Sequence, residues 1–213
     1  MSALYDQNTA LKSHQLAQLA KVLRQESGRS SCVAPLVFMS DPERVPDLPT
    51  AIGALPHGCA VIYRHFGAAN RKVTARLLRE ATQSAGQQLL IGGGDADLAL
   101  SVGADGVHFK RDAELVGPFR LRKQHPNMLI TMAALKGEAY QAPFTCLDGL
   151  FVSSIFPSGS PSAGSPIGTQ TLKTICAELS VPVFALGGIT QQTAPRLKGT
   201  GISGFAAIGG LMT

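Results

Sequence analysis

Eight short apolar segments, most of them followed by a stretch of helical pattern, constrain the fold of this chain more than any other feature. They cover residues 35–39, 60–64, 89–91, 106–109, 129–132, 149–152, 183–186 and 204–208. Each is a continuous apolar run, which is typical of parallel strands whose outer face is covered by helices. Helical patterns occupy residues 47–55, 69–85, 95–102, 112–124, 136–140, 168–179 and 191–198.

Strands and helices that alternate in this way predict an α/β fold, a single closed (β/α)8 TIM barrel. An open doubly wound sheet is the rival architecture, and the number of strands disfavours it. An additional amphipathic stretch, residues 8–25, precedes the first strand. We therefore expect an N-terminal helical extension over residues 1–30 and a barrel over residues 31–213. This extra helix could cover the bottom of the barrel or a partner, so a homo-oligomer is left open.

Composition narrows the function classes. Charged residues make up 15% of the chain and the net charge is +5, but the basic residues are scattered without a run. Nucleic-acid binding is therefore not expected, whereas a phosphorylated small molecule suits a mildly basic protein. No apolar run is long enough to span a membrane. Together with the lack of an early signal-like apolar region, this predicts a cytoplasmic protein. The four cysteines are far apart, so we expect buried free thiols.

Paired glycines follow two consecutive predicted strands near the end of the chain. They occur in "ALGGIT", residues 185–190, and in "GFAAIGGL", residues 204–211. In a barrel of this kind, the loops after strands seven and eight commonly bind phosphate. Glycine lets the backbone approach the anion, and free N–H groups at a helix start point toward it. Gly187, Gly188, Ile208 and Gly209 are therefore candidate phosphate-binding residues.

Four stretches together carry a family resemblance: "PVFALGGIT", "ADLALSVGADGVHF", "GLFVSSIFPSGSP" and "GFAAIGGL". The chain resembles the thiamine phosphate synthase family, including its thiazole tautomerase relatives, from about residue 35 to its end. The resemblance implies a transferase of thiamine biosynthesis, which joins an aminopyrimidine diphosphate to a thiazole phosphate with Mg²⁺ and releases pyrophosphate. It also implies that Ser158, Ser160 and Gly168 belong to the site that binds the phosphorylated thiazole.

The other half of the family's site is largely absent from this chain. The family's Q-x-R-x-K becomes "IYRHF", which keeps Arg64 but has Ile62 and Phe66 in place of the glutamine and lysine. The family's N-D-R, whose aspartate binds metal, falls on Gly93, Gly94 and Asp95. Further departures are Arg111 for a glutamine, Ala113 for an acid, Ala133 and Leu135 for a serine and a histidine, and Pro161 for a lysine.

These losses predict a divergent member that binds a phosphorylated thiazole or thiamine phosphate and catalyses poorly or differently. The candidate catalytic residues are Arg64, His65, His108 and Arg111. Asp95 and Asp112 are candidate metal ligands, although both also suit helix caps. Mg²⁺ is expected only if the synthase reaction is retained.

A different reaction at the same phosphate site, with His65, His108 or Arg64 as acid–base or anion-binding groups, is one open hypothesis. Two further hypotheses stay open. One is an active synthase with relocated ligands, namely Asp95, Asp112 and Arg111. The other is a non-catalytic protein that binds thiamine intermediates. The glycine run Gly92–Gly94 is interpreted as an emptied metal site, and the alternative is that its N–H groups bind an anion.

Overall fold

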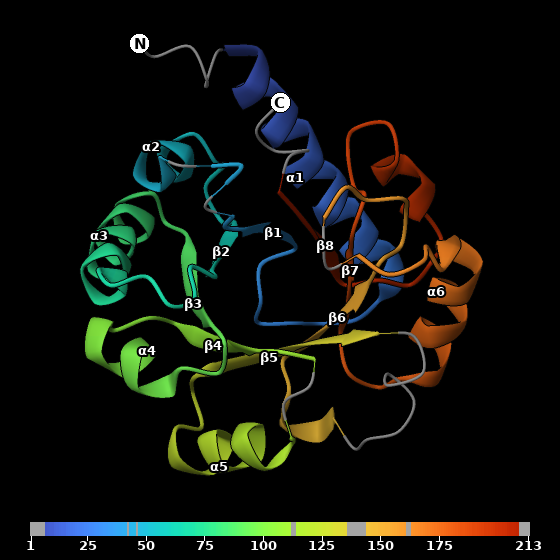
Figure 1. Ribbon diagram of the computed structural model, residues 1–213. Coiled ribbons are helices and arrows are strands. Elements are labelled where there is room, and N and C mark those ends of the chain that lie inside the picture. Colours follow the sequence, from blue (N-terminus) through green and yellow to red (C-terminus); the bar gives the residue numbers. More distant parts are fainter. Residues whose placement is uncertain are drawn as a thin grey trace.

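A closed barrel of eight parallel strands, in sequence order, forms the centre of the computed structural model (Figure 1). The structure describes residues 7–41, 43–45, 47–111, 114–135, 144–160 and 163–208. Strand β8 pairs with β1 and closes the barrel. The predicted (β/α)8 TIM barrel is therefore confirmed. The strands are β1 (Leu36–Met39), β2 (Ala60–Tyr63), β3 (Gln88–Gly92), β4 (Gly106–Phe109), β5 (Leu129–Leu135), β6 (Gly149–Ser153), β7 (Val183–Leu186) and β8 (Gly204–Ala207).

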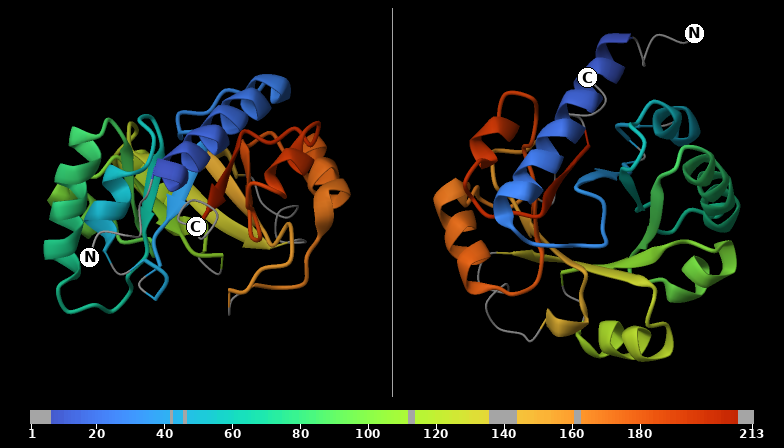
Figure 2. Two further views of the ribbon diagram at one scale, coloured as in Figure 1. Left: turned by 90° about the horizontal axis from the view of Figure 1, so that it is seen from above. Right: turned by 180° about the vertical axis from the view of Figure 1, so that it is seen from behind.

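Helices and short helical turns surround these strands (Figure 2). They are α1 (Gln7–Ser27), α2 (Leu48–Gly53), α3 (Arg71–Ser84), α4 (Ala96–Val102), α5 (Val116–Gln124), η2 (Phe144–Cys146), α6 (Gly168–Glu178) and η3 (Ala194–Leu197). The helix predicted at 136–140 lies outside the described residues. No helix in the described ranges combines the length and apolarity needed to cross a bilayer.

The α-helix predicted at residues 191–198 is wrong. Residues 191–193 form turns and only Ala194–Leu197 is helical, as a 3-10 turn. The Thr193 hydroxyl explains the difference, because its Oγ1 accepts the N–H of Thr190 and donates to the carbonyl of Gly188, each at 2.8 Å. Side chains that bond to nearby backbone in this way compete with helix formation.

The barrel interior is apolar and tightly filled. Within β1, Val37 and Met39 belong to the interior cluster, whereas Leu36 and Phe38 pack outward against the helices. The rings of Phe151 and Phe184 stack inside the barrel with their centroids 4.9 Å apart.

Glycines at two strand starts make room for the ring of Phe184. A Cβ at Gly149 would lie 2.9 Å from that ring, and a Cβ at Gly204 would lie 2.7 Å from it. Both contacts are closer than packed carbon atoms tolerate. This end of the barrel is therefore filled by an aromatic side chain that strand-start glycines accommodate.

Helix α1 runs along the outside of the barrel beside β1 and β8 (Figures 1 and 2). Leu16, Ala20 and Leu23 are buried in the core that the helices share with the strands. Arg24 donates to the carbonyls of Ser203 at 2.7 Å and Val33 at 2.6 Å, just before β8 and β1. The extra helix therefore packs on the outer side of the barrel, against β1 and β8.

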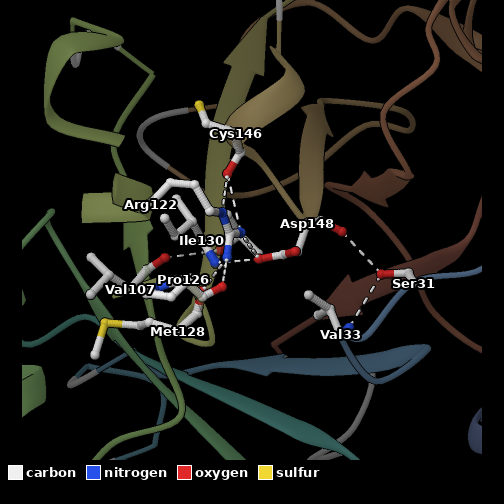
Figure 3. A network of polar contacts seen from close by, with 10 residues as sticks. Ser31, Val33, Val107, Arg122, Pro126, Met128, Ile130, Cys146 and Asp148 are labelled. Atoms are coloured by element: carbon white, nitrogen blue, oxygen red, sulfur yellow. Dashed lines mark hydrogen bonds and ion pairs between the residues drawn. The ribbon is translucent and has the colours of Figure 1, made fainter. Parts of the chain in front are cut away.

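Two aspartates hold the amino-terminal end of the barrel in the same way. Asp105 accepts from Arg79 of α3 at 2.7 Å and from the N–H of Leu89 at 2.8 Å. Asp148 accepts from Arg122 of α5 at 2.5 Å and from the N–H of Ile130 at 2.7 Å (Figure 3). Each carboxylate therefore ties a helix to the start of a strand.

Three of the four cysteines are buried free thiols, as expected, but Cys32 is exposed. Burial raises the pKa of the Cys59 and Cys176 thiols to about 12. Both thiols therefore stay protonated at neutral pH. The exposure of Cys32 reflects its position in the loop between α1 and β1, where chain segments lie at the surface.

Candidate functional site

A pocket of about 490 Å³ opens at the carboxyl ends of β2, β6, β7 and β8. This is the end of a (β/α)8 barrel at which active sites occur, and the volume suits a small-molecule ligand. The lining comprises Arg44, Arg64, Ser153, Ser154, Phe156, Pro157, Ser158, Gly159, Ser160, Ala163, Leu186, Gly187, Gly188, Ile189, Thr190, Thr193, Ala206, Ala207 and Ile208.

Most of the residues that the sequence predicts to bind phosphate line this pocket. Arg64, Ser158, Ser160, Gly187, Gly188 and Ile208 all line it. Gly168 does not line it: this residue starts α6, and its N–H donates to the carbonyl of Ile155 at 3.1 Å. Gly209 lies outside the described residues.

The turn after β7 packs so closely on the loop after β6 that only glycine fits. A Cβ at Gly188 would lie 2.3 Å from the carbonyl oxygen of Pro157, and one at Gly187 would lie 2.9 Å from Ser154. Both glycines also have positive φ, +95° at Gly187 and +65° at Gly188, a conformation that other residues rarely adopt. The two loops therefore form one continuous wall of the pocket.

Arg64 extends from the end of β2 into the pocket. Its Nε donates to the carbonyl of Ser40 at 2.9 Å, and its Nη2 lies 3.8 Å from Asp41. Burial lowers the pKa of Arg64, nearby Asp41 raises it and Arg44 lowers it. An arginine this basic remains charged. Arg44, which the sequence analysis missed, lines the same pocket and lies 4.0 Å from Asp41.

The Gly92–Gly94 turn is not part of the pocket lining, although a Cβ at Gly92 would lie 3.3 Å from Cγ of Arg64, and aromatic rings lie beside Gly93 and Gly94. A Cβ at Gly93 would lie 2.9 Å from the ring of Phe66, and a Cβ at Gly94 would lie 3.0 Å from the ring of Phe109. The N–H of Gly94 donates to the carbonyl of His108 at 3.1 Å. This N–H is therefore already bonded within the fold, and a side chain at Gly93 or Gly94 would have to displace an aromatic ring.

Asp95 is engaged on both carboxylate oxygens. One oxygen caps α4 by accepting the N–H of Leu98 at 3.0 Å, and the other pairs with Arg71. Arg71 also donates to the carbonyl of Gly92 at 2.7 Å. No three potential metal-ligating side chains cluster anywhere in the described ranges. The described residues around this turn therefore do not fit a divalent metal ion, and Asp112 and Ala113 lie outside them.

The three remaining catalytic candidates do not line the pocket. His108 is buried, with Nδ1 2.9 Å from the hydroxyl of Thr131, and its ring meets Phe151 edge-on at 5.2 Å. Burial, helped by Arg64, lowers the pKa of His108 to about 3, so the ring is neutral near pH 7. Burial also lowers the pKa of His65. Arg111 is exposed in the turn after β4.

Comparison with known proteins agrees with this geometry. The family described as thiamine monophosphate synthase matches residues 37–211. The thiamine-phosphate synthase of Moorella thermoacetica is 33% identical over 168 residues, 76% of this chain and 79% of that protein. That of Chloroflexus aurantiacus is 35% identical over 160 residues, 73% of each chain.

A solved structure extends the likeness to the fold. The thiamine phosphate pyrophosphorylase from Pyrococcus furiosus superposes with a TM-score of 0.68 and 25% identity, covering 87% of each chain. The family match spans most of the sequence, and the relatives agree with it in both sequence and barrel architecture. The chain therefore belongs to the thiamine phosphate synthase family, a family of thiamine biosynthesis.

Proposed function

We propose that the pocket binds a phosphorylated thiazole or thiamine phosphate, and that synthase catalysis by this chain is impaired or altered. The observation that carries the proposal is the contrast between two parts of the carboxyl-terminal face. Ser158, Ser160, Gly187 and Gly188 share one pocket, whereas the turn at Gly93 and Gly94, where the family's metal ligand would fall, abuts aromatic rings.

Charge supports the second half of the proposal. A diphosphate ester brings about three negative charges, and departure of pyrophosphate requires cations beside the leaving group. Arg44 and Arg64 are the two basic residues that line the described part of the pocket. Negative charge that the site leaves without a partner would raise the barrier by roughly several kcal/mol.

The alternative of an active synthase with relocated ligands requires Asp95, Asp112 and Arg111 to take over the metal and the diphosphate. It predicts that Asp95→Ala and Asp112→Ala abolish Mg²⁺-dependent formation of thiamine phosphate. Asp95 would have to leave Arg71 and the α4 cap to bind Mg²⁺, which favours the first proposal. A protein that only binds thiamine intermediates would show the same affinity without turnover.

Calorimetric titration tests the proposed ligand. We expect thiazole phosphate to bind and the unphosphorylated thiazole alcohol to bind at least about 10-fold more weakly, because hydrogen bonds to charged groups contribute about 1.5–3 kcal/mol each. Arg64→Gln and Ser158→Ala should weaken the phosphate ester selectively. Ser101→Ala on the surface of α4 is the control. Equal affinity for ester and alcohol, or no binding, would contradict the proposal.

A cytoplasmic location, a phosphorylated small-molecule partner and a homo-oligomer remain predictions. The absence of nucleic-acid binding, expected from the scattered basic residues, is also still a prediction. Gel filtration of the purified chain would test the homo-oligomer, and an electrophoretic mobility assay would test nucleic-acid binding.

A further inference from the structure

Arg71, at the start of α3, is fixed beside the turn that follows β3. Its Nη1 pairs with Oδ2 of Asp95, and its Nη2 donates to the carbonyl oxygen of Gly92 at 2.7 Å. The side chain is only 16% exposed. A positive charge that the chain itself supplies is therefore held at the turn where the family's metal ligand is expected.

Two aromatic rings also lie against this guanidinium. Cζ of Arg71 is 5.8 Å from the ring centroid of Tyr63 and 5.9 Å from that of Phe66. The faces of aromatic rings attract cations, and more strongly where the cation is withdrawn from water. Nε of Arg71, by contrast, is buried and has no hydrogen-bond partner among the described residues. Attraction of the charge to Asp95 and to the two rings, rather than complete hydrogen bonding, therefore accounts for the position of Arg71.

The oxygen atoms that Arg71 contacts are of the kind that Mg²⁺ prefers. A carboxylate and a backbone carbonyl are both hard oxygen ligands, and here both are bonded to the guanidinium. The other carboxylate oxygen of Asp95 accepts the N–H of Leu98 at 3.0 Å. A divalent ion at these oxygens would have to displace Arg71, and the charge of the guanidinium would repel an ion beside it.

We propose that the guanidinium of Arg71 is a resident cation of this turn, which takes the place of a metal ion and keeps divalent ions out. A guanidinium suits this role because it is planar, always charged and more weakly hydrated than an ammonium group. The inference rests on the second half of the proposed function, the loss of the family's metal site. It is independent of the proposed phosphate site.

Chemical rescue tests the resident cation with the full-length protein. Arg71→Ala should open a space that ethylguanidinium fills, so about 20 mM of this cation should raise the Tm of the variant by about 2 °C at matched ionic strength. N-ethylurea, a neutral molecule of similar shape, should not raise it. Wild type and Arg71→Met, whose side chains fill the space, should not respond, and neither should exposed Arg76→Ala on α3. Equal shifts with the two probes, or no shift with either, would overturn the inference.

Binding of Mn²⁺, a paramagnetic substitute for Mg²⁺, tests the exclusion of metal ions. Each protein is titrated with Mn²⁺, and the EPR signal of the free ion is followed. Arg71→Met should bind Mn²⁺ at least about 10-fold more tightly than wild type or Arg71→Lys, and adding Asp95→Asn to Arg71→Met should abolish the gain. Equal, weak binding by wild type and Arg71→Met would overturn the inference alone. Tight binding by wild type that Asp95→Asn abolishes would overturn both the inference and the proposed loss of the metal site.

Discussion

The ring of Phe66 covers Gly93: a Cβ added to that glycine would lie 2.9 Å from Cε1 of the ring. Phe66 is also 51% exposed, and Nζ of Lys110 lies 4.8 Å from its centroid. The ring therefore lies beside both the glycine turn and a cation. The loss of a side chain at position 93 and the gain of an aromatic ring at position 66 form one structural unit, which the sequence alone presents as two separate departures.

A double-mutant cycle measures this coupling. We expect Gly93→Ala to destabilise the fold by about 2 kcal/mol or more, through positive φ and contact with the ring. In the Phe66→Ala background the contact is gone, so the cost should fall by about 1 kcal/mol. Chemical unfolding of the four proteins gives the coupling energy.

Gly103→Ala is the matched control for this cycle. Gly103 has φ +66°, but a Cβ there would have no heavy atom within 4 Å. Its substitution therefore reports the cost of positive φ alone, and that cost should not depend on Phe66. Additive effects of Gly93→Ala and Phe66→Ala would contradict the account.

Asp95 is expected to stabilise the fold, as the cap of α4 and the partner of Arg71. Asp95→Asn keeps an oxygen that can cap α4 but loses the charge that pairs with Arg71, so we expect a loss below about 1 kcal/mol at this partly exposed pair. Asp95→Ala loses cap and pair together and should cost about 1–2 kcal/mol. Urea unfolding measures both, with exposed Asp97→Ala as the control. A more stable Asp95→Ala protein would show that the carboxylate is strained rather than structural.

His108 predicts a pH dependence of stability. Its pKa falls from 6.5 to about 3 on folding, so the unfolded chain binds the additional proton. The contribution of neutral, buried His108 to the free energy of unfolding is therefore fully present above about pH 6.5. It is lost as the pH falls from there toward 3. Between pH 7.5 and pH 5 the wild type should lose about 2 kcal/mol more than His108→Gln. Equal slopes for His108→Gln and wild type would refute the assignment.

Asp148 should contribute more to the free energy of unfolding than a surface ion pair does. Its substitution by alanine leaves the N–H of Ile130 and the guanidinium of Arg122 without their shared partner (Figure 3). We expect a loss of about 1–3 kcal/mol, and a similar loss for Asp105→Ala, which has the equivalent contacts. A change below about 0.5 kcal/mol in denaturant unfolding of either variant would show that water replaces the carboxylate.

The barrel was predictable because its signals are local. Continuous apolar runs mark all eight strands, and the ends differ from the expected ones by only a few residues. The place of Gly187 and Gly188 in the pocket was also predictable, since ligand sites of this fold lie at the carboxyl ends of the strands. The 3-10 turn at Ala194–Leu197 was not, because the side-chain bonds of Thr193 decide it.

The remaining parts of the site depend on contacts between distant residues. Nothing in the pattern around Arg44 places it in the pocket with Arg64, since it lies in a loop with no motif of its own. The aromatic rings beside Gly93 and Gly94 come from positions 66 and 109. A substitution pattern can reveal that a family's ligand is missing, but only the fold shows what occupies its place.

The most direct test of the central claim is a paired assay on the purified chain. Aminopyrimidine diphosphate, thiazole phosphate and Mg²⁺ are supplied together, and thiamine phosphate is followed by fluorescence after oxidation. Thermal shifts are recorded with each ligand alone. The account predicts a shift with thiazole phosphate or thiamine phosphate and little or no product. Robust Mg²⁺-dependent formation of thiamine phosphate would contradict it and would mean that the metal and diphosphate ligands have moved to other residues.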